Sequence, residues 1–266
     1  MEQTVTYGIS KRAFYISLNC PVDGNLFCAE MMDGLFSALT EAEGDREADL
    51  VIIRSGQDGV FSGGHNINKL NGLDHVEAKH YNLRGQRIIK LIRSMKKPVL
   101  ALVDGDCFGP AFELILSCDM VFATERSRFA FPETEHGFMP GFGGTQLASR
   151  KIYETFVKYL VFTGDSVSPE ELFEKGIVTK VFTDHSDMDI KASEFAELIS
   201  KRSSFAIGLA KETINNTVDM DFDKGLLLEQ NAFTFSFSTH DKHEGTKAFG
   251  EKREPEFKDR WEDYRF

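Results

Sequence analysis

Residues 97–150 decide the fold of this chain, and they read KPVLALVDGDCFGPAFELILSCDMVFATERSRFAFPETEHGFMPGFGGTQLASR. Two apolar runs, at 99–105 and 119–124, have the length of buried strands, and a short helix is predicted between them at 110–118. The dipeptide Lys97-Pro98 ends a preceding helix, predicted at about 75–96, because proline does not continue a helix. Strands that alternate with helices in this way favour an α/β core.

The same alternation extends toward the N-terminus. Residues 12–18 alternate apolar and polar side chains as a half-buried strand does, and we expect a hairpin with residues 4–9. Residues 27–42 carry apolar side chains at four-residue spacing, which is helical, and LVIIRS at 50–55 indicates a buried strand. The α/β pattern therefore begins near the start of the chain.

Helices dominate the C-terminal part of the sequence. In the segment Ser168-Pro169-Glu170-Glu171, Ser168 is a predicted N-cap, Pro169 suits the first helical position and Glu171 completes a capping box. Gly176 then ends this helix before the predicted strand IVTKVF, and residues 186–250 have a wholly helical pattern. We expect an α/β core over 1–185 and a helical region over 186–266.

Composition excludes several classes of function. The formal net charge of −11 over 266 residues disfavours binding to nucleic acid or to anionic membranes, which needs a basic face. The four cysteines form no Cys-x-x-Cys pair, and no clustered histidines indicate a metal site. No apolar run approaches the ~20 residues of a membrane span, so we expect a soluble, cytoplasmic protein with reduced cysteines and no metal.

Three segments carry candidate chemistry. The first, Phe61-Ser62-Gly63-Gly64-His65-Asn66-Ile67, has paired glycines that let a ligand approach the backbone, although a plain turn is the better explanation of this motif taken alone. The second places Glu113 one turn into a helix whose N-terminus could stabilise an enolate oxygen, unless Glu113 only complements the helix dipole. The third, residues 131–146, is a glycine-rich loop with Glu133, Glu135 and His136, whose charges could also be merely solvated.

In this order and spacing, the three segments resemble the enoyl-CoA hydratase/isomerase (crotonase) family. The resemblance spans nearly the whole chain and is strongest over 97–182, including VFTGDSVSPEELFEKGIVTKVF at 161–182; the tail HEGTKAFGEKREPEFKDR at 243–260 is similar too. It implies a spiral of ββα units followed by a helical region used in trimerisation, often as a dimer of trimers. It also implies an acyl-CoA substrate, with coenzyme A as part of the substrate and no separate cofactor.

The resemblance implies roles for individual residues. The family's two hydratase glutamates match Glu113 and Glu133, twenty residues apart, and in a hydratase they hold the water that adds to the β-carbon. Isomerases of the family can use one glutamate at the Glu133 position. Substrate and CoA contacts are implied for Gly63, Gly64, Asn66, Ile67, Gly109, Gly141, Phe249 and Lys252.

The sequence departs from the family at the oxyanion positions, which match His65 and Pro110. His65 replaces a usually small residue, and Pro110 has no N–H, so one of the two expected donors is missing. The amide of Ala111 or Phe112, or the His65 side chain, could donate instead. Otherwise the substrate differs, or activity is lost.

We therefore expect an acyl-CoA hydratase that adds water to a 2-enoyl thioester. Phe108, Phe138 and Phe142 favour a cyclic or aromatic acyl group, although core packing also explains these side chains. The alternatives are a double-bond isomerase, hydrolase or decarboxylase of the same fold, acting on a CoA- or carrier-linked acyl group. An alternative of another class is a non-catalytic homologue that binds acyl thioesters.

Overall fold

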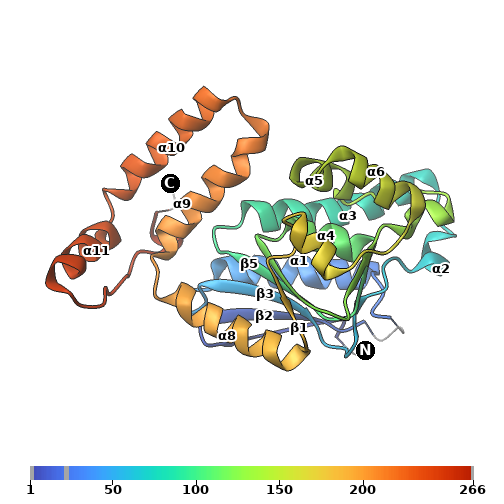
Figure 1. Cartoon of the computed structure of the whole chain (residues 1–266), viewed down its shortest axis with the longest axis horizontal. Coiled ribbons are helices and arrows are strands. Elements are labelled where there is room, and N and C mark those ends of the chain that lie inside the picture. The colour runs from blue at the N-terminus through green and yellow to red at the C-terminus, as the bar shows by residue number, and fades with distance from the viewer. Residues whose placement is uncertain (1–2, 21–23, 265–266) are drawn as a thin grey trace.

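A six-stranded sheet forms the centre of the computed structural model, which describes residues 3–20 and 24–264 (Figure 1). Its strand order is β1-β2-β3-β5-β7-β9; β1 and β2 pair antiparallel and all other neighbours pair parallel. The strands are β1 (Val5–Ser10), β2 (Ala13–Leu18), β3 (Leu50–Ser55), β5 (Val99–Val103), β7 (Met120–Thr124) and β9 (Lys180–Phe182). The predicted hairpin and the predicted α/β core are thus both confirmed.

A second, smaller sheet was not predicted from the sequence. It consists of β4 (Val60–Ser62), β6 (Asp106–Phe108) and β8 (Arg128–Ala130), paired in parallel. Each of these short strands follows a strand of the large sheet, and Gly105 makes one of the turns between the sheets at φ +89°. A Cβ at Gly105 would lie 1.9 Å from the carbonyl oxygen of Gly59, so only glycine allows this approach.

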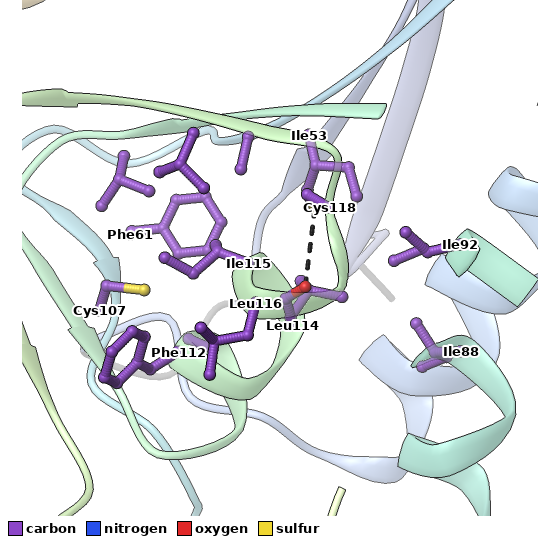
Figure 2. Close-up of a cluster of buried hydrophobic side chains, with 14 of the residues drawn as sticks. Ile53, Phe61, Ile88, Ile92, Cys107, Phe112, Leu114, Ile115, Leu116 and Cys118 are labelled. Atoms are coloured by element: carbon purple, nitrogen blue, oxygen red, sulfur yellow. Dashed lines mark hydrogen bonds between the residues drawn. The ribbon is translucent and has the colours of Figure 1, made fainter. Parts of the chain in front are cut away.

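Helices cover both faces of the large sheet. The core on one face includes buried side chains of α1 (Ala29–Gly44), α3 (His75–Ser94) and α4 (Pro110–Ser117), and α8 (His185–Ser200) packs on the other face through Met188, Ala192 and Ala196. Figure 2 shows side chains of α4, among them Phe112 and Ile115, in the first core together with Phe61. All four cysteines are buried free thiols in the structure.

Local signals explain where several helices begin. The Ser168 Oγ accepts a hydrogen bond from the amide of Glu171 at the start of α7 (Pro169–Glu174), which confirms the predicted N-cap. A complete capping box forms at α3, where Asp74 accepts from the amide of Glu77 and the Glu77 side chain accepts from the amide of Asp74. The remaining site-side helices are α2 (Ile67–Leu70), α5 (Gly144–Lys151) and α6 (Glu154–Thr163), with a 3₁₀ helix, η1, at Pro132–His136.

The C-terminal helices extend away from the sheet (Figure 1). They are α9 (Ser204–Asn216), α10 (Phe222–Ser236) and α11 (His240–Glu251), with 3₁₀ turns at Thr217–Asp219 and Trp261–Tyr264. The tail returns to this region, because Trp261 stacks on Phe205 with ring centroids 4.4 Å apart. In the described part of the chain, no helix is both long and apolar enough to cross a membrane.

Candidate active site

Glu113 is held rigidly in the interior by backbone donors. It lies in the first turn of α4 and is fully buried. Its Oε1 accepts a hydrogen bond from the amide of Gly141 at 3.2 Å, and its Oε2 accepts one from the amide of Gly144 at 2.5 Å. A Cβ at Gly144 would lie 2.7 Å from Glu113 Cγ, so the glycine-rich loop wraps closely around this side chain.

The environment of Glu113 changes its acidity. Burial is the largest cause that raises the pKa of Glu113 to about 7, and the nearby Glu133 also raises it, whereas the amides of Gly144 and Gly141 lower it. A carboxyl group with this pKa exchanges its proton near neutral pH. Such a group is suited to general acid–base catalysis.

Glu133 is equally buried but has no fixed partner. It lies in η1 with 1% of its surface exposed, and neither carboxylate oxygen accepts a hydrogen bond from any described residue. Gly109 packs against it: a Cβ there would lie 2.6 Å from Glu133 Oε1, and Gly109 has φ +52°. A buried carboxylate without a hydrogen bond is costly, which indicates that a ligand or substrate completes this site.

The His65 side chain lies beside Glu133. Its Nε2 is 3.6 Å from Glu133 Oε1, and its Nδ1 is 2.9 Å from the hydroxyl of Tyr81. The rings of Phe138 and Phe142 meet the imidazole edge-on, each with a centroid distance of 5.5 Å. Sequence reasoning missed Tyr81, because a tyrosine on a predicted helix gives no sign of which loop its hydroxyl will reach.

The amide donors near the site can be assigned from the backbone pairing. Phe27 and His65 form a parallel bridge that uses the Gly64 carbonyl and the Asn66 amide, so the His65 amide points away from this bridge. Pro110 is the first residue of α4, and the amide of Gly109 is already bonded to the Ala130 carbonyl. The next amides of the helix, those of Ala111 and Phe112, lack an acceptor within it.

An apolar cavity of about 360 Å³ opens next to this cluster. Phe138 and Phe142 line it as expected, whereas Phe108 is not among its lining residues. The walls consist of His65, Leu70, Leu73, Ala78, Tyr81, Asn82, Phe138, Met139, Gly141 and Phe142. Because His65 both lines the cavity and faces Glu133, its ring lies between the cavity and the two carboxylates.

The other predicted contact residues separate into two groups. Gly63 and Gly64 lie at the end of β4, Gly64 with φ +102°, and Ile67 opens α2. The Asn66 side chain caps α2 by accepting from the amide of Lys69.

Phe249 and Lys252 form the second group, on and just after α11, with Phe249 87% exposed. Helix α11 lies at the opposite end of the molecule from α2 (Figure 1). Within one chain these two residues are therefore not brought to the site.

His65, Glu113 and Glu133 are close enough to be considered as metal ligands. One donor atom from each lies within 4.8 Å of the other two. Both oxygens of Glu113 accept backbone hydrogen bonds, which hold this carboxylate in place. The His65 Nδ1 lies 2.9 Å from the Tyr81 hydroxyl and its Nε2 faces Glu133, so hydrogen bonding accounts for the arrangement of these side chains without a metal.

The fold and site together define a class: an α/β protein with two buried carboxylates close to an apolar cavity. The family model described as enoyl-CoA hydratase/isomerase matches residues 8–260. The chain belongs to the enoyl-CoA hydratase/isomerase family. This membership confirms the resemblance on which the site residues were assigned.

Several relatives are similar over nearly their whole length. The crotonyl-CoA hydratase of Syntrophomonas wolfei is 32% identical over 240 residues, which cover 90% of this chain and 92% of the relative. The short-chain-enoyl-CoA hydratase of Clostridium acetobutylicum is 32% identical over 246 residues, with 92% and 94% covered. The crystal structure of an enoyl-CoA hydratase from Bacillus anthracis matches with a TM-score of 0.91 at 30% identity, covering 96% of this chain and 99% of that one.

Proposed function

We propose that this protein is an acyl-CoA hydratase that adds water across the 2,3-double bond of an enoyl thioester. The observation that carries the proposal is the pair of buried glutamates, Glu113 and Glu133, beside an apolar cavity. The names of the similar hydratases support the same reaction. Coenzyme A enters as part of the substrate, and we expect no separate cofactor.

The two glutamates divide the proton transfers. Because two amides direct Glu113 as an acceptor, its carboxylate takes a proton from the water whose oxygen bonds to the β-carbon. Glu133, whose oxygens have no fixed partner among the described residues, takes part in delivering a proton to the α-carbon. The double bond and one O–H bond of the water break, and one C–O bond and one C–H bond form. The proton that Glu113 takes from the water is the one that reaches the α-carbon through Glu133, so both carboxylates end as they began.

The thioester oxygen gains negative charge as water adds, so it needs hydrogen-bond donors. The amide of His65 is one candidate, because the bridge to Phe27 leaves it unused. Pro110 supplies none, so the second donor in this proposal is the amide of Ala111 or Phe112 in the first turn of α4.

The cavity supports an apolar acyl group. Its wall includes the rings of His65, Tyr81, Phe138 and Phe142, and the only acidic or basic side chain among its lining residues is His65. Aromatic rings pack well edge-on against another ring. We propose a ring-bearing or short branched 2-enoyl group rather than a long linear chain.

A double-bond isomerase is the second candidate. The oxygens of Glu133 favour it, because no described residue donates to them and a single carboxylate can move a proton between two carbons of the substrate. An isomerisation adds no water, so Glu113 would have no water to deprotonate. The two reactions are therefore distinguished by their dependence on Glu113.

We also propose a homotrimer or a dimer of trimers. Helices α9, α10 and α11 expose an unusual number of large apolar side chains, which supports burial against other copies. These side chains are Leu226, Leu227, Ile214, Phe222, Phe233, Phe237 and Phe249. The cytoplasmic location expected from the sequence stays a prediction.

The test is a hydration assay on a panel of 2-enoyl-CoA thioesters, including crotonyl-CoA and a ring-bearing analogue. We expect Glu113→Gln and Glu133→Gln each to lower kcat by at least ~100-fold, as for lost general acid–base catalysis. Double-bond migration that survives Glu113→Gln would instead establish the isomerase. Binding without turnover on any substrate would refute both reactions.

A further inference from the structure

The imidazole of His65 links two other groups of the site, and this link suggests a role beyond the two glutamates. We propose that Tyr81, His65 and Glu133 form one hydrogen-bonded chain that positions the Glu133 carboxylate for proton transfer. In this chain the Tyr81 hydroxyl donates to His65 Nδ1, and His65 Nε2–H donates to Glu133. The kinetic part of this inference rests on the proposed hydratase function.

Geometry provides the first support. The Tyr81 hydroxyl is 2.9 Å from His65 Nδ1, a normal hydrogen-bond length, and His65 Nε2 is 3.6 Å from Glu133 Oε1. The second distance is longer than a hydrogen bond, but catalytic contacts often tighten when substrate binds. Since both Glu133 oxygens are buried and otherwise unpartnered among the described residues, His65 is the side chain placed to satisfy one of them.

The charges around His65 select one tautomer. If Nδ1 carried the proton, the lone pair of Nε2 would face the Glu133 carboxylate and repel it. With the proton on Nε2, the ring instead offers a donor to the carboxylate and an acceptor to Tyr81. The titratable groups that face the His65–Tyr81 pair are Glu133 from η1, Glu113 from α4 and Cys28 at the start of α1.

Tyr81 is suited to be the donor at the other end. Burial raises the pKa of Tyr81 above its ordinary range, and the negative charge that Cys28, Glu113 and Glu133 can carry raises it further. The phenol therefore keeps its proton at neutral pH. Helix α3 holds it firmly, because Phe142 packs between Tyr81 and Gly85; a Cβ at Gly85 would lie 2.2 Å from the Phe142 ring.

Three substitutions test the two proposed hydrogen bonds separately. His65→Ala removes both links, Tyr81→Phe removes only the hydroxyl, and His65→Gln keeps an amide near the position of Nε2. We expect kcat to fall about 10- to 100-fold in His65→Ala, as for a lost hydrogen bond to a charged group, with KM changed less than about threefold. We expect a fall of about 2- to 10-fold in Tyr81→Phe and partial recovery in His65→Gln.

A spectroscopic measurement tests the chain independently of turnover. In protein labelled with ¹⁵N-histidine, the His65 signals, assigned by their loss in His65→Gln, should show the proton on Nε2. Tyr81→Phe should shift the Nδ1 signal. The exposed Tyr153→Phe and His75→Gln are matched controls that should leave both the His65 signals and kcat unchanged.

The outcomes are distinct. If His65→Ala raises kcat, or lowers KM without lowering kcat, His65 is only a steric barrier between the cavity and the glutamates, and the inference is wrong. Protonation on Nδ1, or stoichiometric zinc bound through His65 in the purified protein, would also overturn it. If the wild-type protein hydrates nothing, the proposed function fails, and the ¹⁵N measurement still decides whether the chain exists.

Discussion

Two glutamates that are both buried have different surroundings in this site. Glu113 accepts hydrogen bonds from the amides of Gly141 and Gly144, whereas neither oxygen of Glu133 accepts one from a described residue. Backbone amides are fixed donors, so Glu113 keeps its orientation through a reaction. No described residue donates a hydrogen bond to Glu133, so its oxygens remain available to a water or to the substrate. The division of roles proposed above follows from this difference.

The acidity of Glu113 leads to a prediction about pH. Below its pKa of about 7 Glu113 is protonated and does not accept a proton from water, so we expect kcat for hydration to rise as pH increases through 7. Glu113→Gln should remove this rise from the residual activity, whereas the exposed Glu47→Gln should retain it. Rates measured between pH 5.5 and 8.5 check it, and a wild-type rate that falls over this range would contradict a base role.

The same pKa also affects stability. Burial raises the pKa of Glu113 from 4.5 in the unfolded chain to about 7, so the folded state binds the proton more tightly. The stabilising contribution of the protonated form is full below pH 4.5 and is lost as pH rises through 7. The loss amounts to about 3 kcal/mol. Above pH 7, where Glu113 must be ionised to act as a base, its burial therefore lowers the free energy of unfolding.

At the scale of elements, the start of α4 brings the site together. Gly109 adopts a left-handed φ that lets Glu133 approach, Pro110 begins the helix, and Glu113 follows one turn later. Proline favours the first helical position because its φ already fits and its missing N–H has no helical partner there. Pro110, which has no N–H to donate, thus stabilises the start of the helix that carries Glu113.

Pro110→Ala tests which of these effects matters. We expect kcat to stay within about threefold of wild type, because the later amides of α4 serve as donors, and the free energy of unfolding to fall by about 0.4–1 kcal/mol. Pro169→Ala, at the first position of α7, is a matched control for stability alone. Enzyme kinetics and urea unfolding provide the two measurements. A rise in kcat of ~100-fold would show that the missing donor limits the natural protein.

Elements were predicted well where the signal was local. The run LVIIRS, the Pro98 helix stop and the Ser168 cap depend on neighbouring residues, and each element formed as expected. The strands β4, β6 and β8 were missed because three residues are too short for an alternation pattern. The meeting of His65 with Tyr81, sixteen residues away, depends on how α3 packs against the loop and is not encoded in either segment alone.

At the scale of the whole molecule, the C-terminal helices carry large apolar side chains that the described part of the chain leaves exposed. The projecting helices α9 and α10 pack against each other, yet Ile214, Phe222 and Phe233 are each more than 60% exposed. Fully burying such a side chain is worth roughly 1.5–3 kcal/mol. Leaving several of them in water is costly, so association with other copies is the expected state of this region.

The oligomer prediction follows from this exposed face. Light scattering coupled to size exclusion should give three or six times the chain mass of 30.0 kDa. Phe233→Asp should shift the protein to smaller species, because a charge on an apolar interface is desolvated without a partner. Phe173 is an exposed side chain on α7, outside the C-terminal helices, so Phe173→Asp should leave the mass unchanged. A monomeric wild-type protein would contradict the prediction, and it would also remove the route by which Phe249 and Lys252 of another copy could reach the site.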